Sequence, residues 1–175
     1  MRRRLGALAL ALLAALAVYW FAVRDRTVVA TVSVPQPAAT IGSGAEALVV
    51  SSTGRVLPWF PIPEGTPLPR LPLAEAPKSG RLAGPALEQA RVLGAVPAAL
   101  RPYLASSRYG ESGVDVELTT GIELRFGDGS QAKRKWRAAA AVLADPSITE
   151  LDYVNLHSPS RPSVGGSGHL LPPVP

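Results

Sequence analysis

The chain has 175 residues, of which 18 are proline and 16 are glycine, and it contains no cysteine. This length allows one modest domain. The proline share is about twice the usual one, which indicates long irregular stretches. The lack of cysteine excludes a disulfide framework and a thiolate metal site. The net charge of +5 does not indicate nucleic-acid binding, because five arginines and one aspartate within the first 26 residues carry +4 of it.

The first element in chain order is an uncharged apolar run over residues 5–23. At about 1.5 Å per residue a helix of this length spans about 28 Å, close to the hydrocarbon thickness of a bilayer. A cleaved signal peptide would have a shorter run followed by small residues. The sequence instead predicts an uncleaved, single-pass, type II signal anchor in a plasma membrane, with residues 1–4 in the cytoplasm and the rest of the chain outside it. The flanking residues that support this prediction are a basic group and an aromatic belt, namely Arg2, Arg3, Arg4, Tyr19, Trp20 and Phe21.

The region after this run alternates between short β-rich and irregular stretches. A β-branched run predicts a strand over 27–34, followed by a loop over 35–44, and a hairpin is expected with strands at 47–50 and 55–57. Residues 58–83 are read as a proline-rich extended connector, because proline cannot donate ladder hydrogen bonds. Trp59 and Phe60 are expected to pin this connector to the domain.

Helical patterns follow the connector. Pro85 suits a first helical turn, and the apolar spacing predicts a helix over 86–93. One or two further helical turns are expected over 97–104, and a short strand over 106–109.

The most regular stretch lies between residues 114 and 157. Alternating apolar residues predict one strand at 114–119 and a second at 122–126, joined by a tight hairpin at Gly121. A glycine-rich turn then leads to a helix over 131–143, which Asp145-Pro146 ends. Residues 151–157 read as a final strand. The Pro/Gly/Ser-rich tail over 165–175 is predicted to be disordered.

No set of residues in the sequence forms a recognisable catalytic or metal site. His157 is expected on the surface, and two histidines without an acidic cluster do not make a metal site. Asp115 and Glu117 share a strand face and are the only candidates for paired carboxylates, but the solvated face of a hairpin is the preferred interpretation. The sequence therefore predicts a non-enzyme with no cofactor, no metal and no nucleic-acid partner.

Several motifs occur together in one order. They are the hairpin, the turn "GIELRFG", a lysine before an alanine-rich helix, "LDYVNL" and "PSRPSV". Upstream, "LVVSSTGRV", "LPL" and "RTVVA" continue the series. This order resembles the FtsQ/DivIB family of bacterial cell-division proteins over about residues 27–164. That resemblance implies a domain outside the cytoplasm, a place at the division septum, and a scaffold role through partners of the FtsB/DivIC and FtsL type. The POTRA domain that the family places before this region is expected to be missing, because only a few residues separate Val23 from Thr27.

The predicted binding site is the last strand. A strand that precedes a proline-rich tail is expected to be a sheet edge, whose free N–H and C=O groups accept a partner's strand. The candidate residues are Tyr153, Val154, Asn155, Leu156 and His157, with Tyr153 as the anchor and the two apolar residues facing the core. The alternative is that this strand is covered and Tyr153 packs on a neighbour.

The predicted fold class is α+β: one N-terminal transmembrane helix, followed by an extracytoplasmic domain over 24–164 with a small, mostly antiparallel sheet and two packed helices. The predicted function is a division scaffold, and the alternatives are an anchored interaction module with a non-division partner and an anchored enzyme.

Overall fold

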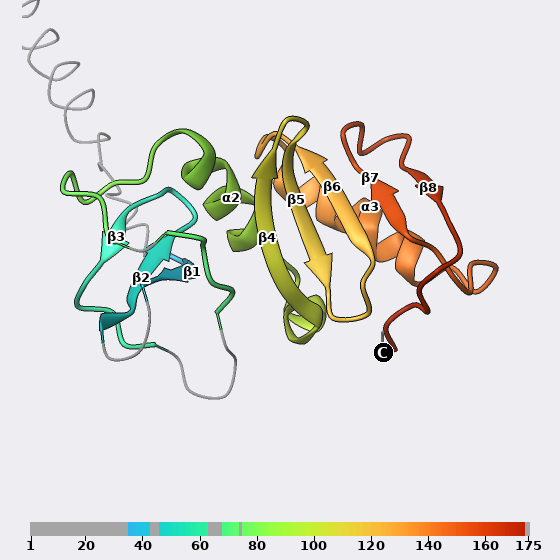
Figure 1. The fold of residues 1–175 in the computed structure, drawn as a ribbon, viewed down its shortest axis with the longest axis horizontal. Coiled ribbons are helices and arrows are strands. Elements are labelled where there is room, and N and C mark those ends of the chain that lie inside the picture. The colour runs from blue at the N-terminus through green and yellow to red at the C-terminus, as the bar shows by residue number, and fades with distance from the viewer. Residues whose placement is uncertain (1–34, 43–45, 63–67, 74, 174–175) are drawn as a thin grey trace, which may run out of the picture. The chain divides into compact units, whose positions relative to one another are not determined.

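The structure is a computed structural model that describes residues 35–42, 46–62, 68–73 and 75–173. In these residues the chain forms a three-stranded sheet and a five-stranded sheet, with helices beside them (Figure 1). The elements in chain order are β1 (Pro37–Ile41), β2 (Leu48–Ser51), β3 (Val56–Leu57), α2 (Gly84–Gly94), the 3-10 helix η2 (Ala98–Tyr103), β4 (Leu104–Gly110), β5 (Gly113–Leu118), β6 (Glu123–Gly127), α3 (Ala132–Leu143), β7 (Tyr153–Asn155) and β8 (Ser163–Gly165).

The small sheet has the order β1-β2-β3, with both pairs antiparallel. The hairpin predicted over 47–57 is confirmed. The loop predicted over 35–44 is wrong over 37–41, where β1 pairs with β2. Pro37 occupies the first position of β1, where a missing N–H is tolerated, and Ala39 and Ile41 behind it are buried. Because prolines flank and begin this segment, there was no clear sequence signal for a strand in which Ala38, Ala39 and Ile41 belong to the core.

The described residues of the connector predicted over 58–83 are more ordered than expected. Leu71, which is fully buried, donates its N–H to the Thr40 carbonyl at 2.8 Å, and Thr40 donates to the Pro69 carbonyl at 2.9 Å. Pro69 therefore supplies a carbonyl to this pairing, while Thr40 and Leu71 donate the N–H groups. Trp59 is 70% exposed, so the prediction that it pins the connector is wrong.

The large sheet has the order β4-β5-β6-β7-β8. The hairpin β5–β6 is confirmed, with Gly121 at φ 93° donating its N–H to the Leu118 carbonyl. β6 and β7 are parallel and are connected through α3, whereas the other pairs are antiparallel. Because α3 and its loops form the crossover, the chain reaches β7 on the far side of β6.

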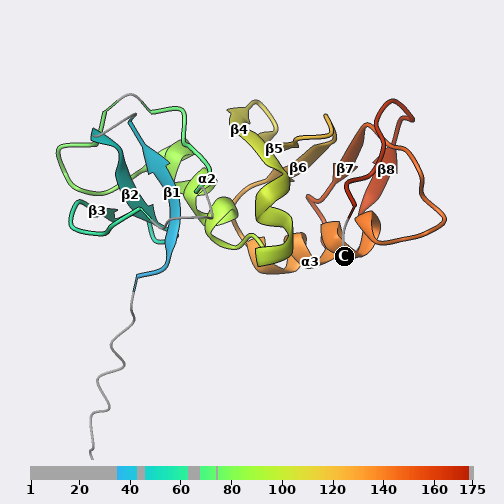
Figure 2. The ribbon, with the colours of Figure 1, turned by 90° about the horizontal axis from the view of Figure 1, so that it is seen from below.

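Helices cover one face of the large sheet. In Figure 2, α3 lies beneath the strands, and among the described elements no helix covers the opposite face. Both predicted helices are confirmed, within one or two residues at each end. The α3 stripe packs Ala132, Trp136, Ala139 and Leu143 onto the core, but Lys135 is buried with them, which the charge pattern did not predict. We refer to the opposite face of the large sheet, which no described helix covers, as the open face.

The predicted fold class and localisation need correction. Among the described residues no helix is long and apolar enough to cross a membrane. Within the described residues the two α-helices have 11 and 12 residues, about 17 and 18 Å, whereas a bilayer core is about 30 Å thick. The predicted anchor at 5–23, with Arg2, Arg3, Arg4, Tyr19, Trp20 and Phe21, and the predicted strand at 27–34 lie outside the described residues. The domain also has two sheets, not the single one predicted, because the connector separates them.

The tail predicted to be disordered over 165–175 is ordered as far as the structure describes it. Residues 163–165 form β8 against β7. Beyond it, Leu151 donates its N–H to the His169 carbonyl at 2.9 Å, and the Tyr103 hydroxyl donates to the Pro173 carbonyl at 2.6 Å. Backbone pairing thus orders a segment whose composition is typical of disorder.

Candidate partner-binding surface

The predicted site strand lies inside the sheet. β7 pairs with β6 on one side and with β8 on the other, so the interpretation of 151–157 as an edge strand is wrong. The reason is that the segment between Pro162 and Gly166, whose proline and glycine content argued against a strand, contains β8. A partner cannot add a strand to β7 while β8 is in place.

The predicted division of the site residues between two faces is confirmed. Val154 and Leu156 are fully buried. Tyr153 and Asn155 are half-buried on the open face, and His157 is exposed. The two apolar residues are therefore core residues, and the three polar ones border the open face.

Tyr153 packs on neighbouring strands. Its ring lies 4.0 Å from the Arg125 Cζ atom of β6, a cation–π contact. On the other side it lies against Gly165 of β8, where an added Cβ would come within 2.6 Å of the Tyr153 hydroxyl oxygen. An aromatic ring over a cross-strand glycine covers backbone that would otherwise be open. Tyr153 therefore helps to hold β8 on the sheet, in agreement with the alternative interpretation of this residue.

The rest of the open face carries ion pairs. Arg108 of β4 contacts the Glu123 carboxylate at 2.9 Å and the Asp115 carboxylate at 3.5 Å, and Arg125 contacts Glu123 at 2.8 Å. Burial acts to raise the pKa of Glu123, but hydrogen bonds from Arg125 and Arg108 hold that pKa below its usual range. Glu117 accepts a hydrogen bond from the Ser106 hydroxyl. The carboxylates are thus engaged with neighbouring strands of the sheet.

Asp115 is the one buried acid of this face among the described residues. Its Oδ1 atom has no hydrogen-bond partner. Burial, and next repulsion from Glu123, raise the pKa of the Asp115 carboxyl.

Replacing Asp115 with Asn is expected to raise the midpoint of thermal unfolding at pH 7. An acid whose pKa is raised by folding destabilises the folded state above that pKa, and the cost disappears below the unfolded value of 3.8. The gain should therefore shrink as the pH falls toward 3.8. Calorimetry across this range checks the sign, with Glu117→Gln on the exposed neighbour as the matched control. A lower midpoint for Asp115→Asn at pH 7 would contradict this account of the face.

The two histidines take part in local structure. His157 donates its backbone N–H to the Asn155 side chain, and its ring lies over Gly127. His169 lies 3.9 Å from the Asp152 carboxylate. Within the part of the chain that the structure describes, no group of three or more histidine and acidic residues is placed to hold a metal ion.

The free edge of the sheet is β8. The Gly165 carbonyl accepts the Asp152 N–H at 2.8 Å, so it points toward β7. Alternate residues of a strand direct their backbone groups to opposite sides, so the N–H and C=O of Val164 point outward. The Val164 side chain is 44% exposed, and no described strand pairs with this side of β8. In the sequence, a valine two residues after Pro162 was the only signal for this strand.

The chain was compared with known proteins. No protein-family model matches it, and no curated protein matches its sequence.

Proposed function

We propose that this chain is a non-enzymatic scaffold that binds division proteins of the FtsB/DivIC and FtsL type through its β-domain. The observation that supports this proposal is the outer edge of β8, which offers the Val164 N–H and C=O beside a half-exposed valine side chain. Such an edge accepts an extended segment by strand addition. The order of sequence motifs supplies the class of partner.

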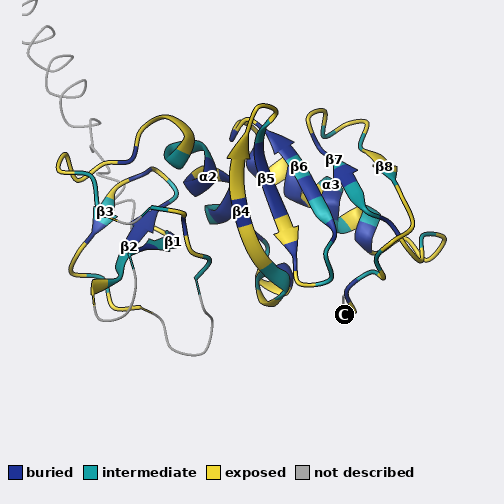
Figure 3. Cartoon of the chain, viewed as in Figure 1, coloured by how far each residue is buried: buried dark blue, intermediate teal, exposed yellow. Residues whose placement is uncertain are grey.

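The open face beside this edge would select which partner segment can pair with β8. A strand paired with β8 would place alternate side chains on the same face as Tyr153 and Arg125. Those two groups already form a rigid contact at 4.0 Å. The neighbouring Asn155 adds hydrogen-bonding capacity, and Figure 3 shows how much of β8 is exposed compared with β7. Preorganised aromatic and polar groups of this kind favour a defined register.

Replacing Val164 with Pro is expected to weaken partner binding at least about tenfold, because it removes the outward N–H and places a ring on the edge. Isothermal titration calorimetry with purified FtsB/DivIC-type and FtsL-type proteins from the same bacterium measures this loss. Val164→Thr keeps the N–H and the branched shape, so it is the matched control and should bind as the wild type does.

Two results would overturn the proposal. The first is that the wild-type protein binds neither division protein. The second is that the Val164→Pro variant binds both with the wild-type affinity and has the wild-type thermal midpoint. Edge-dependent binding of a different protein would favour an interaction module with a non-division partner.

A further inference from the structure

A second surface lies on the small sheet, at residues that the proposed function does not use. Arg55, directly before β3, and Arg81 of the connector form an antiparallel bridge. Val56 donates its N–H to the Gly80 carbonyl at 3.0 Å and Leu82 donates to the Gly54 carbonyl at 2.7 Å. These bonds flank the bridge, so the two arginines form a non-hydrogen-bonded pair, in which opposite side chains stand closest, with Cα atoms about 4.5 Å apart.

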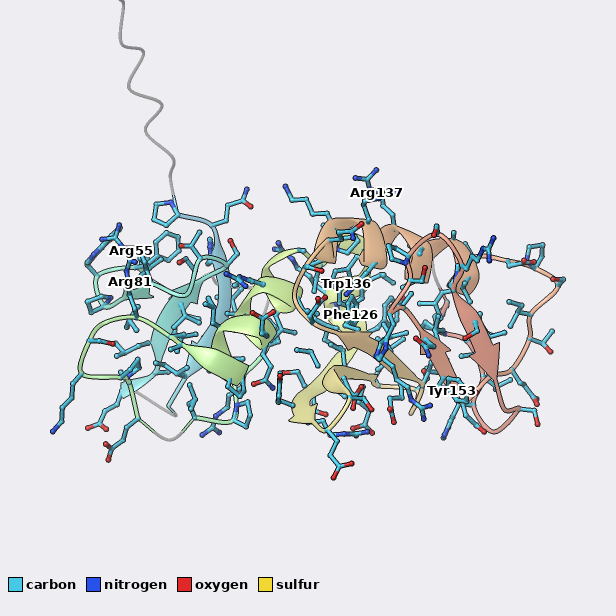
Figure 4. The ribbon with its side chains drawn as sticks, turned by 90° about the horizontal axis from the view of Figure 1, so that it is seen from above. Arg55, Arg81, Phe126, Trp136, Arg137 and Tyr153 are labelled. Atoms are coloured by element: carbon cyan, nitrogen blue, oxygen red, sulfur yellow. The ribbon has the colours of Figure 1, made fainter. Side chains whose placement is uncertain are left out.

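Both guanidinium groups lie on the solvent side of this sheet. The neighbouring residues Gly54 and Leu82 face Leu87 of α2: a Cβ at position 54 would meet the Leu87 side chain, and Leu82 is buried. Strand alternation then directs Arg55 and Arg81 to the opposite face. Both are exposed, and Figure 4 shows them close together at one side of the molecule.

This pair has a cost that nothing within the described residues offsets. Like charges directly opposite each other on neighbouring strands are destabilising. No described carboxylate lies within 4.0 Å of either guanidinium group, although four other arginine and lysine residues have such partners. Exposed Lys78 adds a third positive charge three residues before Arg81. A carboxylate bound between the two guanidinium groups would relieve this repulsion.

The backbone at this site is held by hydroxyl groups. Ser51 Oγ accepts the Arg55 N–H at 3.0 Å. Ser79 Oγ accepts the Arg81 N–H at 3.4 Å and donates to the Arg81 carbonyl at 3.0 Å. The Arg81 backbone groups are therefore occupied by a side chain, which blocks strand addition at this edge. A ligand must be recognised through the arginine side chains.

We infer that Arg55 and Arg81 bind the side-chain carboxylates of an acidic peptide segment in a partner protein. Guanidinium groups match carboxylates with two parallel hydrogen bonds. The patch is too small for a nucleic-acid backbone, which needs a long basic surface. A few residues after Arg55 in the chain comes the turn that follows β3, where Phe60 donates its N–H to the Leu57 carbonyl and where Trp59 and Ile62 are exposed. Apolar side chains of the same peptide would pack against Trp59 and Ile62.

The test uses a fluorescein-labelled octapeptide of alternating Glu and Val, and the matching peptide of Gln and Val, in fluorescence polarisation with the full chain. The wild type should bind the Glu peptide at least about tenfold more tightly than the Gln peptide, and the binding should weaken as salt rises. Arg55→Gln with Arg81→Gln should abolish this preference. Lys133→Gln with Arg134→Gln removes the same charge from α3 and should leave it unchanged.

A second measurement separates binding from folding. Arg81→Glu places opposite charges across the strands, so it should raise the thermal midpoint while it removes binding of the Glu peptide. If Arg81 had a purely structural role, Arg81→Glu would lower the thermal midpoint. Three results would each overturn the inference. The wild type could bind the two peptides with equal affinity, or the α3 control could lose the preference for the Glu peptide as fully as the arginine variant does. The third is that the wild type binds phosphatidylglycerol vesicles and not the Glu peptide. None of these outcomes depends on the edge of β8.

Discussion

Replacing Trp136 with Ala is expected to lower the free energy of unfolding by about 3–5 kcal/mol, the usual range for a buried tryptophan. Trp136 is fully buried in α3, its ring centroid lies 4.8 Å from that of Phe126, and its indole N–H donates to the Val92 carbonyl of α2 at 2.8 Å. One side chain thus connects α3 to the sheet and to α2. For a domain whose total stability is about 5–15 kcal/mol, this loss is a large fraction.

The adjacent residue provides the control for this prediction. Arg137 is exposed on the outer side of α3, and Figure 4 shows it pointing away while Trp136 and Phe126 lie inside. Arg137→Ala should therefore change the stability by no more than about 0.5 kcal/mol. Urea unfolding followed by circular dichroism compares the two variants. A midpoint for Trp136→Ala close to that of Arg137→Ala would contradict the packing described for the core.

Replacing Lys135 with Met is expected to lower the free energy of unfolding by about 2–4 kcal/mol. The reason is that the substitution leaves buried backbone acceptors without a donor. The Lys135 side chain is 3% exposed. Its Nζ atom donates to the Phe126 carbonyl at 2.8 Å, to the Asp128 carbonyl at 3.0 Å and to the Asp128 carboxylate at 2.7 Å. These three bonds use every N–H of the ammonium group and hold the turn between β6 and α3.

Lys133→Met is the matched control, since it makes the same change at an exposed position two residues earlier. The pH dependence gives a second check. The hydrogen bond from Lys135 holds the pKa of Asp128 below its usual value of 3.8. An acid whose pKa is lowered by folding contributes stability above its unfolded pKa and loses it as the pH falls through the folded one. The difference in the free energy of unfolding between the wild type and Lys135→Met should therefore narrow below pH 3.8. A difference that stays constant with pH would contradict the hydrogen bond between Lys135 and Asp128.

The strands and helices that the sequence predicted well are those with a clear period. In β5 and β6 the apolar residues alternate with charged ones, and the structure buries Val116 and Leu124 while their charged neighbours face the open side. The α3 stripe was equally clear. In these segments local pattern and burial agree, and periodicity is a direct consequence of burial on one face.

The parts that were missed depend on contacts distant in sequence. β8 has three residues in a proline- and glycine-rich tail, and only pairing with β7 makes it a strand. Lys135 is a local exception. Its backbone acceptors lie only seven and nine residues earlier, but a lysine among Lys133, Arg134 and Arg137 carries no sign in the sequence that it is the buried one. The arginine pair was invisible in the same way as β8, since 26 positions separate Arg55 from Arg81 in the chain. A sequence pattern does not report which segments become neighbours.

The loop between β7 and β8 gives this sheet a vulnerable point. Arg161 is exposed there, in a short turn where its N–H donates to the Ser158 carbonyl. Exposed loop tips with small polar residues are preferred sites of proteolytic cleavage. Ser158 and Ser160 are exposed in this loop, whereas Pro162 protects the bond after Arg161 from trypsin-like proteases. A single cut next to Ser158 or Ser160 would separate β8 from the covalent chain and leave Tyr153 and Asn155 paired with a short peptide. Loss of that peptide would make β7 the outermost strand, so one proteolytic event would change which backbone the sheet presents.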